Sequence, residues 1–218
     1  MICNQPRLAI AVLLAAMAVL QGCTDKTASV PPAPAASATQ PAFAPITIVH
    51  KLGTTVIEQR PRRVAVLDRY EVDFLDQLGV PVAGLVKDFV PHFLIRYKDD
   101  QDIRDLGAIV QPNLEHIHAL QPDLVLMTSI QANHYQELSQ IAPTLHFDVD
   151  YQNSESKHIE VVKQHLLTLG RIFGKEDLAR QKAAELDAKV ADARKVTQER
   201  PEKALIVLHN HGAFSAFG

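Results

Sequence analysis

The chain has 218 residues, a formal net charge of −3 and 47% hydrophobic residues. This length allows one large domain or two small ones, and the hydrophobic fraction is typical of a globular core. Because no excess of positive charge is present, nucleic acid is not expected as a partner.

The N-terminal segment has the pattern of a bacterial lipoprotein signal. Arg7 supplies a positive charge, and residues 8–20 form an apolar run that fits the 7–15 residues of a signal core and is shorter than the roughly 20 residues of a membrane-spanning helix. Leu20-Gln21-Gly22-Cys23 then places a small residue directly before a cysteine. We predict a signal peptide over residues 1–22 and lipid on Cys23, and the alternative is an ordinary signal peptide. Lipidation would locate the chain outside the cytoplasm, in the periplasm or extracytoplasmic space, anchored to the cell membrane.

Residues 23–45 are rich in alanine, proline, serine and threonine. They show neither helical nor strand periodicity and carry few charges, which is typical of an extended linker. We predict a tether that holds a folded body away from the membrane.

The folded body begins with short strands. Residues 46–50 and 54–58 are β-rich runs joined through Gly53, which predicts a hairpin. Residues 64–67 form a continuous apolar run, as in a parallel strand buried on both faces. Residues 71–78 have a helical apolar face that ends at Gly79, and a strand is predicted over residues 81–86.

The alternation continues along the chain. Asn113 can cap a helix that ends at Leu120, and helix 133–141 is expected between strands 123–127 and 144–149. Strands that alternate with helices in this way predict an α/β fold, a Rossmann-like lobe with a mostly parallel sheet over residues 46–175.

Two longer helices and a strand complete the prediction. The first helix has one clean apolar stripe between Ile159 and Phe173, and Gly174 ends it. The second covers residues 176–200 and has only a narrow apolar seam; a helix of about 24 residues spans roughly 36 Å and suits a connection between two lobes. Residues 204–208 start a strand for which no neighbouring strand is expected, so residues 201–218 would begin an incomplete second lobe.

Several stretches together resemble the iron–siderophore substrate-binding proteins of ABC importers, and in particular their catecholate branch. The stretches are RRVAVLD (62–68), LGVPVAGL (78–85), LQPDLVL (120–126), QIAPT (140–144), and ALIV (204–207) leading to SAFG (215–218). The resemblance implies two lobes joined by one rigid helix, a ferric siderophore bound between them, no cofactor, and an ABC permease with its ATPase as partners. The second lobe would follow Gly218. A truncated, non-transporting chain that acts as an interaction module is the alternative.

Ligand contacts are expected where the strands end. Ligands of open α/β sheets sit outside the carboxyl ends of the strands, where this chain places Arg69, Tyr70, Lys87, Gln131 and, on the last strand, Asn210. Cations and aromatic rings suit an anionic chelate, whereas the alternative for each residue is a solvated loop or capping role.

Position 130 departs from the pattern that the resemblance implies. An arginine is typical there, just before the residue that matches Gln131, but this chain has Ile130. The guanidinium group with its five donors is therefore missing. A less charged siderophore, or a different chelate such as haem or cobalamin, becomes more credible than a trianionic catecholate.

No metal site and no enzymatic activity are predicted. His116 and His118 are two residues apart and would point about 200° away from each other on a helix, and His209 with His211 gives fewer ligands than the three or four of a zinc site. No nucleophile elbow, phosphate-binding loop or pair of catalytic carboxylates is present. Glu115 has two interpretations: the resemblance implies docking to permease arginines, whereas a helix-cap role would contribute about 0.3–1 kcal/mol.

Overall fold

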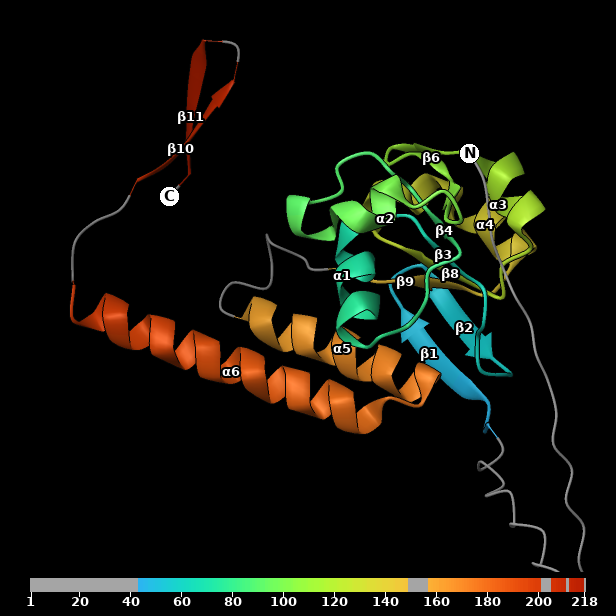
Figure 1. The fold of residues 1–218 in the computed structure, drawn as a ribbon, viewed down its shortest axis with the longest axis horizontal. Coiled ribbons are helices and arrows are strands. Elements are labelled where there is room, and N and C mark those ends of the chain that lie inside the picture. Colours follow the sequence, from blue (N-terminus) through green and yellow to red (C-terminus); the bar gives the residue numbers. More distant parts are fainter. Residues whose placement is uncertain (1–42, 149–156, 201–204, 211, 218) are drawn as a thin grey trace, which may run out of the picture. The chain divides into compact units, whose positions relative to one another are not determined.

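The computed structural model describes residues 43–148, 157–200, 205–210 and 212–217. The predicted signal peptide, Cys23 and the tether as far as residue 42 lie outside the described residues. The fold is of the predicted α/β class, with a parallel sheet and long helices (Figure 1).

The central sheet has five parallel strands in the order β5-β4-β3-β8-β9. Its strands are β3 (Val64–Val66), β4 (Gly84–Leu85), β5 (Arg104–Asp105), β8 (Leu124–Met127) and β9 (Thr144–His146). The apolar runs of β3 and β8 pair with each other, with Val64 opposite Leu124 and Val66 opposite Leu126. Every side chain in both strands is buried, as expected for inner strands of a parallel sheet.

Alternate side chains of these strands contribute to two apolar layers. Val66 and Leu126 pack in the core that includes residues of α1 (Arg69–Gln77), α5 (His158–Phe173) and α6 (Glu176–Gln198). Ala65 and Val125 pack on the other face, with residues of α3 (Leu114–Leu120) and α4 (Tyr135–Ile141). The sheet is therefore covered by helices on both faces (Figure 1).

Polar side chains directly after the strands start the next helices. Asp68 follows β3 and accepts a hydrogen bond from the Tyr70 amide at 3.0 Å, so α1 begins at Arg69, earlier than predicted. Thr128 follows β8 and forms a capping box with Gln131, so the helix η2 (Ser129–His134) precedes α4. Asn113 caps α3 as predicted.

The segment between β4 and α3 was not predicted. It contains η1 (His92–Leu94), α2 (Ile95–Asp99) and β5, followed by the two-residue strands β6 (Gly107–Ala108) and β7 (Gln111–Pro112). At the other end of the sheet, the predicted hairpin is confirmed as β1 (Ile46–His50) and β2 (Gly53–Ile57).

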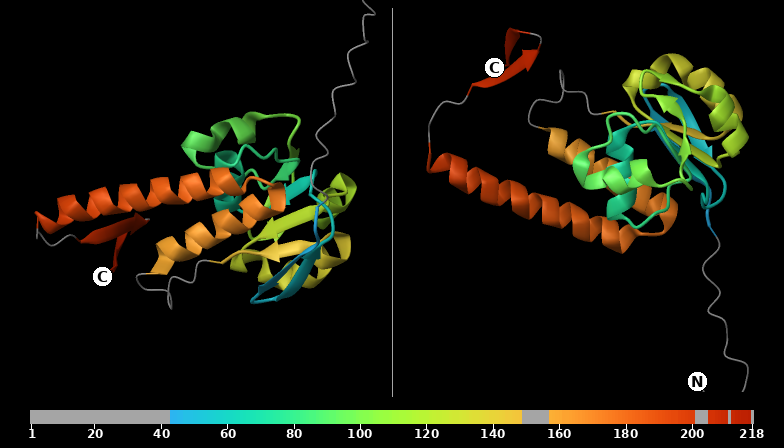
Figure 2. Two further views of the ribbon diagram at one scale, coloured as in Figure 1. Left: turned by 90° about the horizontal axis from the view of Figure 1, so that it is seen from below. Right: turned by 45° about the horizontal axis from the view of Figure 1, so that its top comes forward.

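Helices α5 and α6 lie side by side (Figures 1 and 2). Their close approach depends on Gly170, where a side chain would collide with Ala179. Ala179 and Ala183 are buried, whereas residues 191–198 of α6 are exposed. Within the part of the chain that the structure describes, no helix combines the length and the apolar character needed to cross a membrane.

One prediction about the C-terminal residues is wrong. The strand β10 (Ile206–Asn210) does have a neighbour, because β11 (Ala213–Phe217) pairs with it antiparallel. Gly212, with φ of +83°, adopts the left-handed conformation that a tight hairpin turn requires.

Candidate functional site

A hollow of about 280 Å³ lies at the carboxyl ends of β3, β8 and β9. Helices α1 and α5 also contribute to its wall. Its lining consists of Asp68, Tyr70, Glu71, Phe74, Thr128, Ser129, Ile130, Phe147, Asp148, Val162 and His165. The hollow thus occupies the edge of the sheet at which ligands of open α/β sheets bind.

One side of the hollow is aromatic. The His165 ring lies 4.6 Å from the Phe147 ring and 6.2 Å from the Phe74 ring, the latter in edge-to-face geometry. Burial lowers the pKa of His165 to about 4. His165 is therefore an uncharged ring at neutral pH, and this side of the hollow carries no charge.

Glu71 is a buried acid that lines the hollow. The residue is 1% exposed, and its Oε2 has no hydrogen-bond partner among the described residues. Burial raises the pKa of Glu71 well above the usual range, and the negative charge of Asp68 raises it further. Glu71 consequently keeps its proton at a pH at which a solvated glutamate is ionised.

Asp68 links the strand ends. Its Oδ1 accepts from the Tyr70 amide, and its Oδ2 accepts from the Thr128 hydroxyl at 3.3 Å. Burial raises the pKa of Asp68, although these hydrogen bonds and the charge of Arg69 oppose the increase. Asp68 therefore ties the start of α1 to the end of β8.

Tyr70 lines the hollow, whereas Arg69 is not part of the lining and contacts the hollow only through Tyr70. The Arg69 guanidinium lies 4.7 Å from the centre of the Tyr70 ring and donates to the Tyr70 hydroxyl at 3.2 Å. Tyr70 is 45% exposed and lines the hollow. The two predicted contacts thus form one stacked unit, in which Arg69 holds the tyrosine ring.

The other predicted contacts have different surroundings. Ile130 is half-exposed and lines the hollow. Lys87 donates to the Asp100 carbonyl at 2.6 Å and is not part of the lining. Glu115 is exposed in the first turn of α3. Asn210 lies on β10, and the structure describes its backbone but not its side chain.

Gln131 is fully buried and does not line the hollow. Its Nε2 donates to the carbonyls of Leu67 at 3.2 Å and Ile109 at 2.7 Å, and its Oε1 accepts from the Thr128 amide at 3.0 Å. The Asp88 carboxylate accepts from the Ile109 amide. Gln131 and Asp88 therefore hold both backbone groups of Ile109 and fix the β6–β7 hairpin beside the carboxyl edge.

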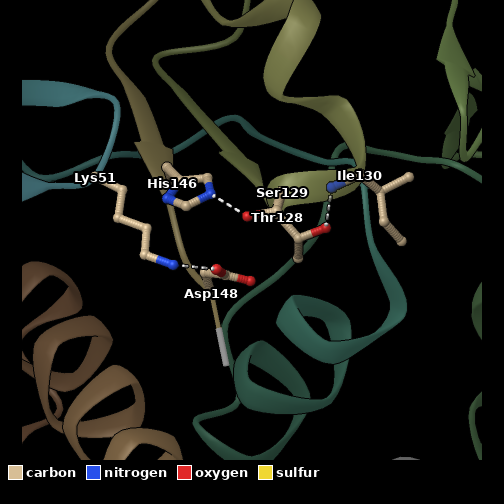
Figure 3. Close-up of polar contacts among 6 residues, drawn as sticks. All are labelled: Lys51, Thr128, Ser129, Ile130, His146 and Asp148. Carbon is tan, nitrogen blue, oxygen red and sulfur yellow. Dashed lines mark hydrogen bonds and ion pairs between the residues drawn. The ribbon is translucent and has the colours of Figure 1, made fainter. Parts of the chain in front are cut away.

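Figure 3 shows polar contacts of residues that line the hollow or lie next to it. The Ser129 hydroxyl and His146 Nε2 share a hydrogen bond of 3.0 Å, and Lys51 in the β1–β2 turn forms an ion pair of 3.1 Å with Asp148. Burial lowers the pKa of His146. These contacts connect the ends of β8 and β9 with the N-terminal hairpin.

The structure gives the surroundings of two of the histidines that were considered for a metal site. His116 Nδ1 shares a hydrogen bond of 2.8 Å with the Asp105 carbonyl, and His209 lies on β10, while His211 is outside the described residues. Across the described ranges, no group of three histidine, cysteine or acidic side chains could hold a metal ion.

Of the lining residues, Tyr70 and Ile130 were predicted contacts and the others were not; Glu71, Phe147, Asp148 and His165 are among those missed. Glu71 did carry a signal, because it lies four residues before Leu75 and seven before Leu78, on the buried face of α1. Phe147 and Asp148 directly follow β9, but the strand was predicted to run to residue 149, so the rule about strand ends did not reach them. His165 carried no signal, because only the packing of α5 against the sheet brings it to the hollow.

Known proteins share this sequence and fold. Residues 64–218 match a family described as periplasmic binding protein. The ferric-anguibactin-binding protein FatB of Vibrio anguillarum is 56% identical over 97% of this chain and 64% of its own length. The petrobactin-binding protein YclQ of Bacillus subtilis is 36% identical over 79% of this chain and 54% of its own length.

A solved structure is also similar. The siderophore-binding protein BauB, bound to ferric iron and two molecules of acinetobactin, aligns with a TM-score of 0.77 and 64% identity. The alignment covers 80% of this chain and 62% of BauB. The chain thus spans less than two thirds of the length of these relatives.

Proposed function

Since this chain belongs to the periplasmic binding protein family, we propose that it acts in the substrate-binding component of an ABC importer and binds a ferric siderophore for iron uptake. The observation that carries the proposal is the hollow at the carboxyl ends of β3, β8 and β9. FatB binds ferric-anguibactin, YclQ binds petrobactin, and BauB binds ferric iron with acinetobactin, which supports the same class of ligand. We propose a binding role without catalysis and without a cofactor.

The residues of the hollow favour a chelate of low net charge. Ile130 provides an apolar surface, Glu71 holds a proton, and Asp68 adds negative charge. Arg69 is the cation stacked on Tyr70. A trianionic chelate would lose its hydration with little positive charge in return, which makes its burial costly.

The remaining features of the function are also proposals. Residues 46–175 would form one binding lobe, α6 the helix between lobes, and residues 201–218 the start of a second lobe that contributes Asn210. Glu115, exposed on α3, would dock to an ABC permease that works with its ATPase. Lipid on Cys23 would anchor the chain to a membrane outside the cytoplasm.

Calorimetric titration of the chain tests the ligand class. Because the proposed site lies between two lobes, we expect the chain to bind ferric-anguibactin more weakly than at micromolar affinity, and to bind trianionic ferric enterobactin at least tenfold more weakly still. Equal or tighter binding of ferric enterobactin would refute the charge argument. Binding of haem or cobalamin in place of every ferric siderophore would assign the chain to another chelate, and micromolar or tighter binding by the chain alone would refute the division of the site between two lobes.

Lipidation has its own test. Bacterial cells that express the chain should carry it in the membrane fraction with a lipid-modified Cys23, detected by mass spectrometry. The Cys23→Ser variant should lose the lipid and leave the membrane fraction. An unmodified Cys23 in the processed wild-type chain would refute the anchor and would leave the binding proposal intact.

A further inference from the structure

The Glu71 carboxyl group has an unmet hydrogen-bonding capacity inside the hollow. Its Oε2 is buried and has no partner in the described part of the chain, although Glu71 lines the hollow. A buried polar group without a partner destabilises the fold, because it has lost its hydration without gaining a hydrogen bond. A ligand group that supplies the partner would therefore recover free energy on binding.

The charges around Glu71 determine which form of the acid a ligand meets. From the start of α1, Asp68 repels a second negative charge and Arg69 attracts it, with the Asp68 effect the larger. From α5, the His165 ring is uncharged at neutral pH. Asp148 after β9 is paired with Lys51, and β8 and η2 contribute only Thr128, Ser129 and Ile130 to the lining. The acid form of Glu71 prevails, so the group can donate a hydrogen bond.

The rest of the lining is suited to an aromatic group. Phe74, Phe147, Tyr70 and Ile130 form apolar surfaces around the hollow. A cavity of about 150 Å³ is sufficient for benzene, and this hollow has about 280 Å³. A substituted ring therefore fits, and contacts between aromatic rings stabilise it beyond the effect of the buried area.

We infer that the hollow is a subsite for an uncharged aromatic arm of the ligand, and that Glu71 donates a hydrogen bond to an acceptor atom on that arm. The inference rests on the proposed function, because the arm belongs to the iron chelate. It makes Glu71 a specificity-determining residue, since its proton selects a hydrogen-bond acceptor, while a carboxylate or phenolate placed there would face the negative charge of Asp68.

Benzamide is a suitable probe, because it combines a neutral ring with a carbonyl acceptor. Nuclear magnetic resonance titration of the chain should show benzamide binding that shifts the signals of Phe74, Phe147 and His165. Glu71→Gln keeps a donor and should bind benzamide about as well as wild type, whereas Glu71→Leu should bind at least tenfold more weakly. Binding to wild type should weaken as the pH rises through the pKa of Glu71, and binding to Glu71→Gln should not.

Two controls make the result specific. Asp73→Asn changes a carboxyl group to an amide on the same helix but outside the lining, and it should leave benzamide binding unchanged. Difference infrared spectroscopy of the wild-type chain at pH 7 should show a protonated carboxyl band that Glu71→Gln removes and Asp73→Asn retains. This spectrum tests the acid form even where a variant folds poorly.

Any one of three outcomes would overturn the inference. Glu71 could be ionised at pH 7, benzoate or benzylamine could bind as tightly as benzamide, or Glu71→Leu could leave benzamide binding unchanged. A chain that binds benzamide as described but no ferric siderophore would support the subsite and refute the proposed function. A chain that binds ferric-anguibactin equally well with and without Glu71 would refute the subsite alone.

Discussion

Replacement of His165 by glutamine should make the protein more resistant to acid. Burial lowers the pKa of His165 from 6.5 to about 4. Between these values the unfolded chain binds a proton at this position and the folded chain does not, so a falling pH favours unfolding. The stability contributed by the neutral ring is complete above pH 6.5 and is lost as the pH falls through about 4.

The size of the effect follows from the shift. One pKa unit corresponds to about 1.36 kcal/mol, so the decrease of His165 from 6.5 to about 4 predicts a loss of about 3 kcal/mol between pH 7 and pH 4. The pKa values of His50 and His146 are also lowered by burial. Both residues remain in the His165→Gln variant, so their contributions cancel in the comparison.

Urea unfolding at pH 7 and pH 4 measures this difference. The wild-type chain should lose about 3 kcal/mol more unfolding free energy between the two pH values than His165→Gln does. His118→Gln is the matched control, because His118 is exposed on α3 and its replacement should leave the pH dependence unchanged. Equal losses in wild type and His165→Gln would show that the ring is not the buried neutral group described above.

Three further changes test contacts that position the site. Gly170→Val should force α5 away from Ala179 and lower the unfolding free energy by about 1–3 kcal/mol, measured by urea unfolding. Asp123→Ala removes the acceptor of the Arg62 and Arg63 amides at 2.7 and 2.8 Å and should cost about 1–3 kcal/mol with faster hydrogen exchange at both amides. Gln131→Leu should accelerate hydrogen exchange at the Thr128 amide and lower the melting temperature, whereas unchanged exchange would contradict the role of its side chain.

The sequence was sufficient for the parts of the fold that local chemistry determines. The strands β3 and β8 followed from their apolar runs, and the start of α3 followed from Asn113. The region from Lys87 to Pro112 was not predictable in the same way. Its two-residue strands are too short for a periodic pattern, and distant groups hold them, including Gln131 on the Ile109 carbonyl.

The candidate site was predictable in position but not in chemistry. The rule about strand ends led to Tyr70 and Ile130, which both line the hollow. It also led to Gln131, because a polar residue after a strand has the same pattern whether it contacts a ligand or supports the backbone. The rule did not identify Glu71 and His165 because both residues lie on helices. Burial sets their protonation, and this burial depends on packing between α1, α5 and the sheet.

Ile130 and Glu71 both disfavour a negatively charged ligand, but for different physical reasons. Ile130 supplies no guanidinium group, so a negative charge near it would gain no ion pair. Glu71 resists ionisation because it is buried beside Asp68, and a negative ligand group would raise its pKa further. Replacement of Ile130 by arginine would therefore not be enough for a trianionic chelate, since the ligand would still face Asp68 in the lining of the hollow. The double variant Ile130→Arg with Glu71→Gln should gain more affinity for ferric enterobactin than the sum of the two single changes, because a guanidinium group in the hollow would favour the ionised form of Glu71, and that carboxylate would compete with the ligand for the new cation. Additive gains would show that the two positions select the ligand independently.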